Sequence, residues 1–210
     1  MSEVLYIKAS PRKGRSHSLA VAEAFLEAYR DLHPQDEIVT LDLFAENLPP
    51  FDGLLINAKY NIMHGRPHSA GEAAAWRVVE DYIAQFKGAD KYVLAAPMWN
   101  FGIPYRLKQY IDIIVQPTYT FSYSPEEGYT GLVTGKPIFI AGARGGSYPP
   151  GTLAAAFDLQ IPYLQVILGF IGFTDFRIVL IEPTLEGGPE TAQARRREAV
   201  AKAREMAKEF

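Results

Sequence analysis

Short apolar segments alternate with helix-like segments along this chain, and no other feature restricts the fold as strongly. The segment 92–96 is wholly apolar, which is typical of a central strand in a parallel sheet covered by helices on both faces. Similar segments predict four further strands, over 4–7, 38–43, 137–141 and 173–181. Strands that alternate with helices form parallel sheets with right-handed crossovers. The sequence therefore predicts an α/β fold: a five-stranded parallel sheet with helices on both faces.

The intervening segments carry the helical period. From Ser18 to Pro34, apolar residues recur at steps of three or four positions. Comparable patterns predict helices over 70–86, 104–115, 189–210 and, as one long helix, 152–168.

Two segments interrupt the alternation of strands and helices. The segment 48–68 is rich in Pro, Gly and Asn, whereas 117–135 is predicted to form a β-hairpin insertion in which 120–123 face 131–133. No linker or repeat divides the chain. We therefore predict a single domain over residues 1–210.

Composition excludes several classes of function. The 210 residues are 48% hydrophobic, enough for one substantial core, and a net charge of −3 provides no basic surface for nucleic acid. Without cysteine there is no disulfide, thiolate nucleophile or iron–sulfur cluster, so redox chemistry requires a bound cofactor. The first strand follows Met1 without a basic leader, and no apolar stretch reaches membrane-spanning length. We expect a cytoplasmic protein with no membrane partner.

The loop after the first strand combines hydroxyl and basic side chains at a helix start. Ser10, Ser16, His17 and Ser18 lie there with three basic residues, and free N–H groups at a helix N-terminus favour a bound phosphate. Neither Ser16 nor Ser18 has the Glu or Gln of a capping box three residues later. A helix cap in a solvated basic loop is the alternative.

Two more loops follow predicted strands. Met98, Trp99, Asn100 and Phe101 can grip a flat heteroaromatic ring by amide groups and apolar cover, although a core aromatic cluster remains the alternative. The loop of Ala143, Arg144, Gly145 and Gly146 allows close approach of backbone N–H groups to ligand carbonyls, or is a plain glycine turn.

All three loops occupy carboxyl ends of strands, where open α/β sheets bind ligands. Phosphate motifs of NTPases and of tightly held dinucleotides are absent. We therefore predict a mononucleotide with one terminal phosphate as the ligand.

At this level of detail the sequence resembles the FMN-dependent NADH azoreductases, which are also described as NADH:quinone reductases. The resemblance spans essentially the whole chain in the same order. It rests on Ser10, 16–18, 95–101, 131–136, 144–146 and 168–172.

The resemblance implies a flavodoxin-like homodimer with FMN at the subunit interface. Ser10 and 16–18 would then hold the phosphate, 98–101 the isoalloxazine edge, and 143–146 the pyrimidine side. Relatives often have Ser in place of Ala143, and some have His in place of Tyr148, which leaves a proton donor unassigned.

The implied activity is hydride transfer from NADH, or NADPH, through FMN to quinones in a ping-pong cycle. Azo compounds would be cleaved to two amines in two such cycles. No protein residue is assigned as catalytic and no metal is expected, because Pro67 lies between His64 and His68 without an adjacent carboxylate. Aromatic residues of the hairpin and after the 152–168 segment could line an acceptor pocket or simply pack: Tyr119, Phe121, Tyr123, Tyr129, Phe170 and Phe173.

The principal alternative is a flavodoxin-type electron carrier without NAD(P)H oxidation of its own. Such carriers tend to be more acidic than a chain with 24 acidic and 21 basic residues, and they lack the hairpin. A flavin-free scaffolding domain would instead be colourless.

Overall fold

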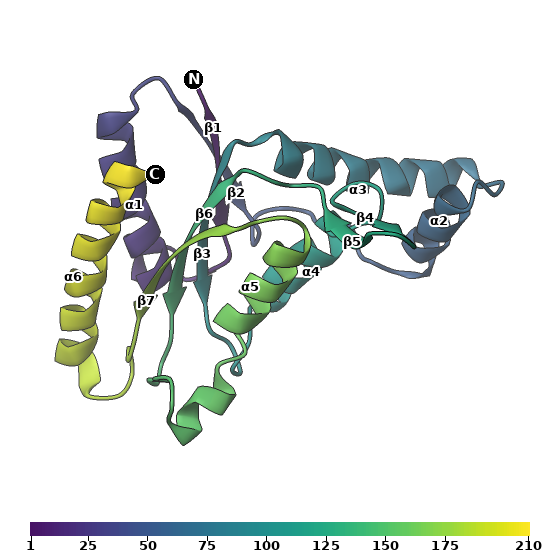
Figure 1. Ribbon diagram of the computed structural model, residues 1–210. Helices are drawn as coiled ribbons and strands as arrows, with labels where there is room; N and C mark the ends of the chain where they lie inside the picture. Colours follow the sequence, from purple (N-terminus) through teal and green to yellow (C-terminus); the bar gives the residue numbers. More distant parts are fainter.

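Five parallel strands form one sheet in the computed structural model, which describes residues 1–210 (Figure 1). The strands are β1 (Glu3–Lys8), β2 (Glu37–Asp42), β3 (Lys91–Pro97), β6 (Pro137–Ala143) and β7 (Asp175–Ile181). Their order is β2-β1-β3-β6-β7, with every pair parallel. This is the flavodoxin-type doubly wound order, in which the direction of winding reverses between β1 and β3. The predicted fold class is confirmed.

Helices cover both faces of the sheet. One face carries α1 (His17–Leu32) and α6 (Gly188–Met206), and the other carries α3 (Ala70–Gly88), α4 (Tyr105–Ile114) and α5 (Ile161–Phe170). Because successive strand side chains point to opposite faces, Val4 and Tyr6 of β1 join the core under α1 and α6. Leu5 and Ile7 join the core on the other face.

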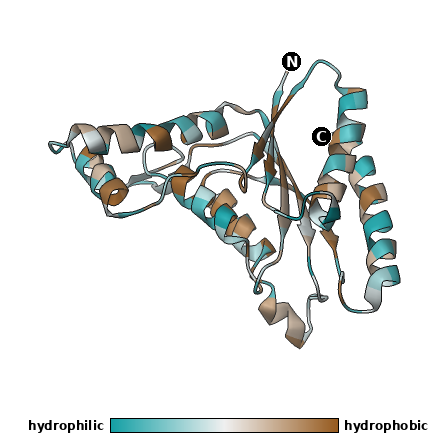
Figure 2. Cartoon of the chain, turned by 180° about the vertical axis from the view of Figure 1, so that it is seen from behind, coloured by the Kyte–Doolittle hydropathy of each residue, from teal (hydrophilic) through white to brown (hydrophobic).

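The core under α1 and α6 is built from aromatic rings and alanines. The Phe25 ring stacks on Phe139 of β6 at a centroid distance of 4.0 Å, and Phe210 meets Phe25 edge-on at 5.0 Å. Hydrophilic residues cover much of the outward sides of these helices (Figure 2). This face of the sheet is therefore completed within one chain.

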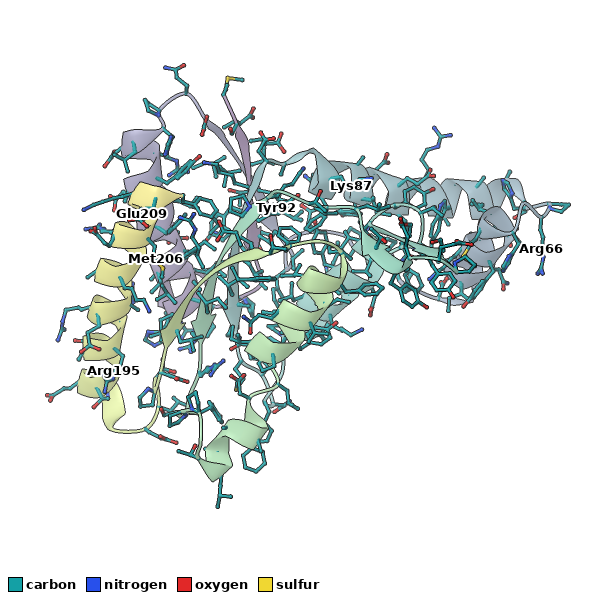
Figure 3. The ribbon with its side chains drawn as sticks, viewed as in Figure 1. Arg66, Lys87, Tyr92, Arg195, Met206 and Glu209 are labelled. Atoms are coloured by element: carbon teal, nitrogen blue, oxygen red, sulfur yellow. The ribbon has the colours of Figure 1, made fainter.

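The segment 48–68, which interrupts the predicted alternation of strands and helices, contains α2 (Gly53–Met63). Asp52 caps it by accepting a hydrogen bond from Leu55 N–H at 3.2 Å. Only Leu55 and Ala58 are buried, so apolar residues around the rest of the helix hide its period. With α3 it forms an arm that extends from the sheet, and Arg66 lies near the arm's end (Figure 3).

The predicted hairpin is confirmed as β4 (Phe121–Ser124) and β5 (Gly128–Gly131). Its register differs from the expectation, because Phe121 pairs with Gly131 but Tyr123 pairs with Tyr129. The hairpin backbone lies directly on the end of α5, so that a Cβ at Gly131 would collide with the backbone of Gly172. Only glycine permits this approach.

The predicted long helix over 152–168 is wrong. The chain forms a 3₁₀ turn, η2 (Leu153–Phe157), leaves the helical path, and restarts as α5. Asp158 causes the restart, since its carboxylate accepts hydrogen bonds from the N–H groups of Gln160 and Ile161. Pro162 in the first turn of α5 has no N–H to satisfy.

Smaller differences concern element ends. The last strand begins at Asp175 and not at Phe173, and α6 ends at Met206 before a 3₁₀ turn, η3 (Ala207–Glu209). No helix combines the length and the apolar character needed to cross a membrane.

Candidate functional site

Loops from four strands meet at the carboxyl edge of the sheet, which faces the bottom of Figure 1. They enclose a cavity of about 130 Å³, several times the space that one water molecule requires. Its walls come from the loops after β1, β3, β6 and β7: Ser10, Arg12, Ser16, His17, Pro97, Met98, Trp99, Ala143, Gly145, Thr184 and Leu185. The cavity occupies the position at which a doubly wound sheet binds its ligand.

The loop after β1 presents the start of α1 to this cavity. Ser16 is the N-cap, and its Oγ accepts a hydrogen bond from Leu19 N–H at 3.3 Å and lies 3.1 Å from Ser18 Oγ. The N–H groups of His17 and Ser18 donate to no other group of the chain. The capping role and the anion-binding role of the loop are thus compatible, because the cap uses a different amide.

His17 has an unsatisfied polar atom at the same place. Its buried Nδ1 has no hydrogen-bond partner in the chain. Burial, followed by the positive charges of Arg196 and Arg12, lowers the pKa of His17 below its usual value of 6.5. A neutral imidazole with a free nitrogen beside two guanidinium groups is suited to an anionic oxygen.

The loop after β3 forms a tight two-residue turn. Trp99 and Gly102 exchange two backbone hydrogen bonds of 3.0 Å, and the central residues Asn100 and Phe101 have φ values of +47° and +69°. These are the positive φ angles of a type I′ turn, which favours Asn and Gly but disfavours Phe. Holding Phe101 there costs about 1–3 kcal/mol, the kind of strain that accumulates at binding sites.

The same turn is attached to its neighbours. Met98 N–H donates to the carbonyl of Ala143 at 2.7 Å, which joins the β3 and β6 loops. The Trp99 ring packs against Phe44 and Tyr105 at centroid distances of 5.8 and 6.2 Å. Asn100 and Phe101 N–H donate to nothing within the chain, so two amides of the turn remain free.

The glycine loop after β6 approaches the loop after β7 closely. The carbonyl of Gly145 accepts hydrogen bonds from the N–H groups of Thr184, Leu185 and Glu186 at 3.0–3.3 Å. Its own N–H and that of Gly146 donate to no other group. A Cβ at Gly145 would stand 2.9 Å from Leu185 Cδ1, so a larger residue there would require the exposed Leu185 side chain to move.

Arg144 differs from its neighbours in the predicted site. Its side chain is buried and forms ion pairs with Asp158 and Glu182, and its N–H donates to the carbonyl of Ile181. The guanidinium is therefore directed into the protein and away from the cavity wall.

Seven of the twelve predicted site residues line the cavity: Ser10, Ser16, His17, Met98, Trp99, Ala143 and Gly145. Ser18, Asn100, Phe101, Arg144 and Gly146 belong to the same loops but not to its lining. The sequence prediction missed Pro97, Thr184 and Leu185, and it included Arg12 only as one of three basic neighbours. Thr184 and Leu185 follow a predicted strand, so their position at a strand's carboxyl end was the available signal.

Comparison with known proteins agrees with this arrangement. A sequence profile described as "flavodoxin-like fold" matches residues 2–207. The chain belongs to this flavodoxin-like family. Within the family it is 56% identical over 210 residues, the full length of both chains, to an FMN-dependent NADH:quinone oxidoreductase of Nitratidesulfovibrio vulgaris.

Solved structures of the family superpose closely on this fold. An azoreductase from Bacillus anthracis matches with a TM-score of 0.92 and 36% identity over the full length of both chains. An FMN-dependent NADH-azoreductase from the same species, solved in complex with FMN, matches with a TM-score of 0.87 and 29% identity over 99% of this chain and 100% of that chain. The resemblance to FMN-dependent NADH azoreductases is thereby confirmed.

Proposed function

We propose that this protein is an FMN-dependent oxidoreductase that transfers a hydride from NADH to quinones and, in two successive cycles, cleaves azo compounds to two amines. The observation that carries the proposal is the set of unpaired backbone amides around the cavity at the β1/β3 switch point. Its relatives of equal length are named for the same chemistry.

The unpaired amides form three groups, suited to the phosphate, to one edge of the flavin ring and to its pyrimidine side. The free N–H groups of His17 and Ser18, with Ser10 and Ser16 and the unpaired His17 Nδ1, are suited to the phosphate. The amides of Asn100 and Phe101 would hold one edge of the ring. FMN, when bound, accepts a hydride from the nicotinamide and delivers two electrons to the acceptor.

The glycine loop has an electrostatic role in this proposal. The Gly145 and Gly146 N–H groups would lie against the pyrimidine side of the ring, where two aligned dipoles stabilise added negative charge. No side chain of the site is assigned as an acid or base, so protons would come from solvent.

We also propose that the active form is a homodimer with FMN at the interface. A second cavity of about 490 Å³ adjoins the Phe101 turn, and its walls are mainly apolar: Gly102, Ile103, Lys108, Leu159, Pro162, Tyr163 and Val166. Leu159 and Val166 are 59% and 71% exposed in the single chain. Burial of such side chains favours association. Residues 1–210 would form one FMN-binding domain per subunit, acting in the cytoplasm.

Anaerobic addition of NADH to the FMN-loaded protein tests the reductase proposal. Rapid loss of the flavin absorption band, followed by its recovery on addition of a benzoquinone, is the expected result. The same protocol with NADPH measures the nucleotide preference. Tight FMN binding without bleaching by either nucleotide would contradict the proposal and favour an electron carrier reduced by another protein.

The hairpin favours the reductase over that carrier. Phe121 and Tyr129 of the hairpin pack against Phe170 of α5 with tilted rings, at centroid distances of 4.7 and 5.5 Å. Tyr123 and Tyr129 are 63% and 65% exposed in the single chain. An exposed aromatic cluster is suited to a flat acceptor such as a quinone.

A further inference from the structure

The guanidinium of Arg144 is a buried charge at the carboxyl edge of the sheet. The residue is only 2% exposed, and each of its donor nitrogens has a different partner. Nε donates to Gln160 Oε1 at 3.1 Å, one terminal nitrogen to Glu182 at 3.2 Å, and the other to Asp158 at 2.8 Å. Two carboxylates thus compensate one cation in a place that water hardly reaches.

The partners of Arg144 are themselves attached to the ring-binding turn. Gln160 Nε2 donates to the carbonyl of Ala96, the residue before Pro97 and Met98, at 3.0 Å. Leu159, between Asp158 and Gln160, donates its N–H to the carbonyl of Phe101 at 3.0 Å. The segment 158–160 therefore connects Arg144 to the last residues of β3 and to the Phe101 turn.

The other side of Arg144 adjoins the glycine loop. Gly145 is its neighbour in sequence, and the carbonyl of Arg144 accepts hydrogen bonds from both the N–H and the Oγ1 of Thr184. The carboxylate of Glu182, the residue after β7, accepts a hydrogen bond from the guanidinium. One side chain thus joins the loops after β3, β6 and β7, but it does not line the cavity.

We propose that Arg144 is a positioning residue that fixes the Phe101 turn relative to the Gly145–Gly146 amides, so that both grip the same FMN ring. This inference rests on the proposed function. The Phe101 turn has strained positive φ angles and needs external support to persist. A planar guanidinium can donate in three fixed directions, whereas a lysine ammonium at the same place is a single compact charge.

The decisive variant is Arg144→Lys, which retains the positive charge but loses the three-way fork. The matched control is Arg177→Lys, because Arg177 also lies on the sheet and pairs with Asp175, but at the opposite end of β7. FMN affinity is measured by flavin fluorescence during titration of the FMN-free protein. Hydrogen exchange of the FMN-free protein reports on the peptides around 98–102 and 144–147.

We expect Arg144→Lys to weaken FMN binding about tenfold to 100-fold, by analogy with the loss on mutating residues that orient the ligands of a metal ion. Exchange should rise in both loops but not in α1 or α6, and the visible circular dichroism of bound FMN should change. Arg177→Lys should alter none of these. A merely structural role would raise exchange throughout the chain and leave the dichroism of bound FMN unchanged, which would overturn the inference.

Asp158→Asn is the second variant if the lysine variant does not fold: its one amide oxygen can still accept the Gln160 and Ile161 N–H groups that begin α5, while its NH2 faces Arg144 and removes that ion pair. It should weaken FMN binding by roughly two- to fivefold, within the range of small coupling effects. Wild-type affinity in a folded variant would overturn the inference while the proposed function stands. Failure of the wild-type protein itself to bind FMN would instead overturn the proposed function.

Discussion

The two faces of the sheet share the same strands, yet they are covered differently. On the α1–α6 face, Leu32 at the end of α1 is the only large exposed hydrophobic side chain of the two helices. On the opposite side, apolar side chains are exposed along α2, the Phe101 turn, the hairpin, η2 and α5: Leu54, Ile56, Tyr60, Met63, Phe101, Tyr123, Tyr129, Leu153, Phe157, Leu159 and Val166.

The difference shows which side the chain leaves for ligands and partners. On the α1–α6 face, the outward sides of the two helices carry mainly charged residues, as on the solvent-exposed surface of a monomeric domain. The opposite side keeps apolar area next to the proposed ring site, which is the pattern of an interaction surface. Association and acceptor binding should therefore depend most on the second side.

The largest effect is expected for Phe139→Ala on the closed face. Deleting a ring that is fully buried and stacked on Phe25 should lower the free energy of unfolding by about 3–5 kcal/mol. Urea denaturation of the FMN-free protein measures it. Val166→Ala on the open face should change stability by less than about 0.5 kcal/mol. Equal losses would abolish the contrast between the faces.

Val166→Glu tests the open face as a subunit interface. A carboxylate in the apolar surface beside the Phe101 turn should weaken self-association about tenfold or more, equivalent to ~1.4 kcal/mol. Sedimentation equilibrium over a range of protein concentrations gives the dissociation constant of the dimer. Ala201→Glu on exposed α6 is the control and should not alter it. A Val166→Glu protein that associates like the wild type would show that the interface lies elsewhere.

Two helix caps separate stability from FMN binding. Ser16 caps α1 and Ser69 caps α3, the latter in a complete capping box with Glu72. Each serine-to-alanine change should cost about 1 kcal/mol in unfolding free energy. Only Ser16→Ala should also weaken FMN binding, measured by fluorescence titration. If Ser69→Ala weakened FMN binding equally, the loss would reflect global stability and the phosphate assignment would fail.

The smallest effect concerns the titration of His17. Because its pKa lies below 6.5 in the folded chain, the unfolded chain binds more protons between the two values. Stability should thus rise with pH up to about 6.5 from this group and be unaffected above it. Bound phosphate should raise the pKa of His17. NMR titration of the His17 imidazole gives its pKa in the free and in the FMN-bound protein, and His17→Gln identifies its signal. An unchanged midpoint on FMN binding would place the phosphate elsewhere.

The parts of the fold that can be predicted from sequence are those with one-sided periodicity. The predictions for α1 and α3 agree with the structure to within two residues at each end, because one stripe of each helix is buried and its caps are ordinary. The sequence does not predict α2, since Leu54, Ile56 and Tyr60 remain exposed around Leu55 and Ala58. When the solvent-exposed side of a helix is also apolar, the spacing of apolar residues in the sequence does not reveal the helix.

Site residues can be predicted from the sequence where they directly follow the carboxyl end of a predicted strand. The rule that open sheets bind ligands at the carboxyl ends of their strands is sufficient to select Ser10, Met98 and Gly145 from the sequence. The burial of Arg144 is not predictable, because its partners Asp158 and Glu182 lie 14 and 38 positions away in sequence. The break that presents Asp158 lies inside what the apolar spacing predicts as one helix.

The contact of Gly131 with Gly172 has a consequence for engineering. The hairpin rests on the end of α5 backbone to backbone, with Val133 N–H bonded to the carbonyl of Ile171 at 2.8 Å. The exposed ring at Tyr123, farther along the hairpin, makes no such approach. Libraries that alter substrate range should therefore randomise the distal part of the hairpin and leave its glycine base intact, since one added methyl group at Gly131 would push the hairpin away from the backbone of Gly172.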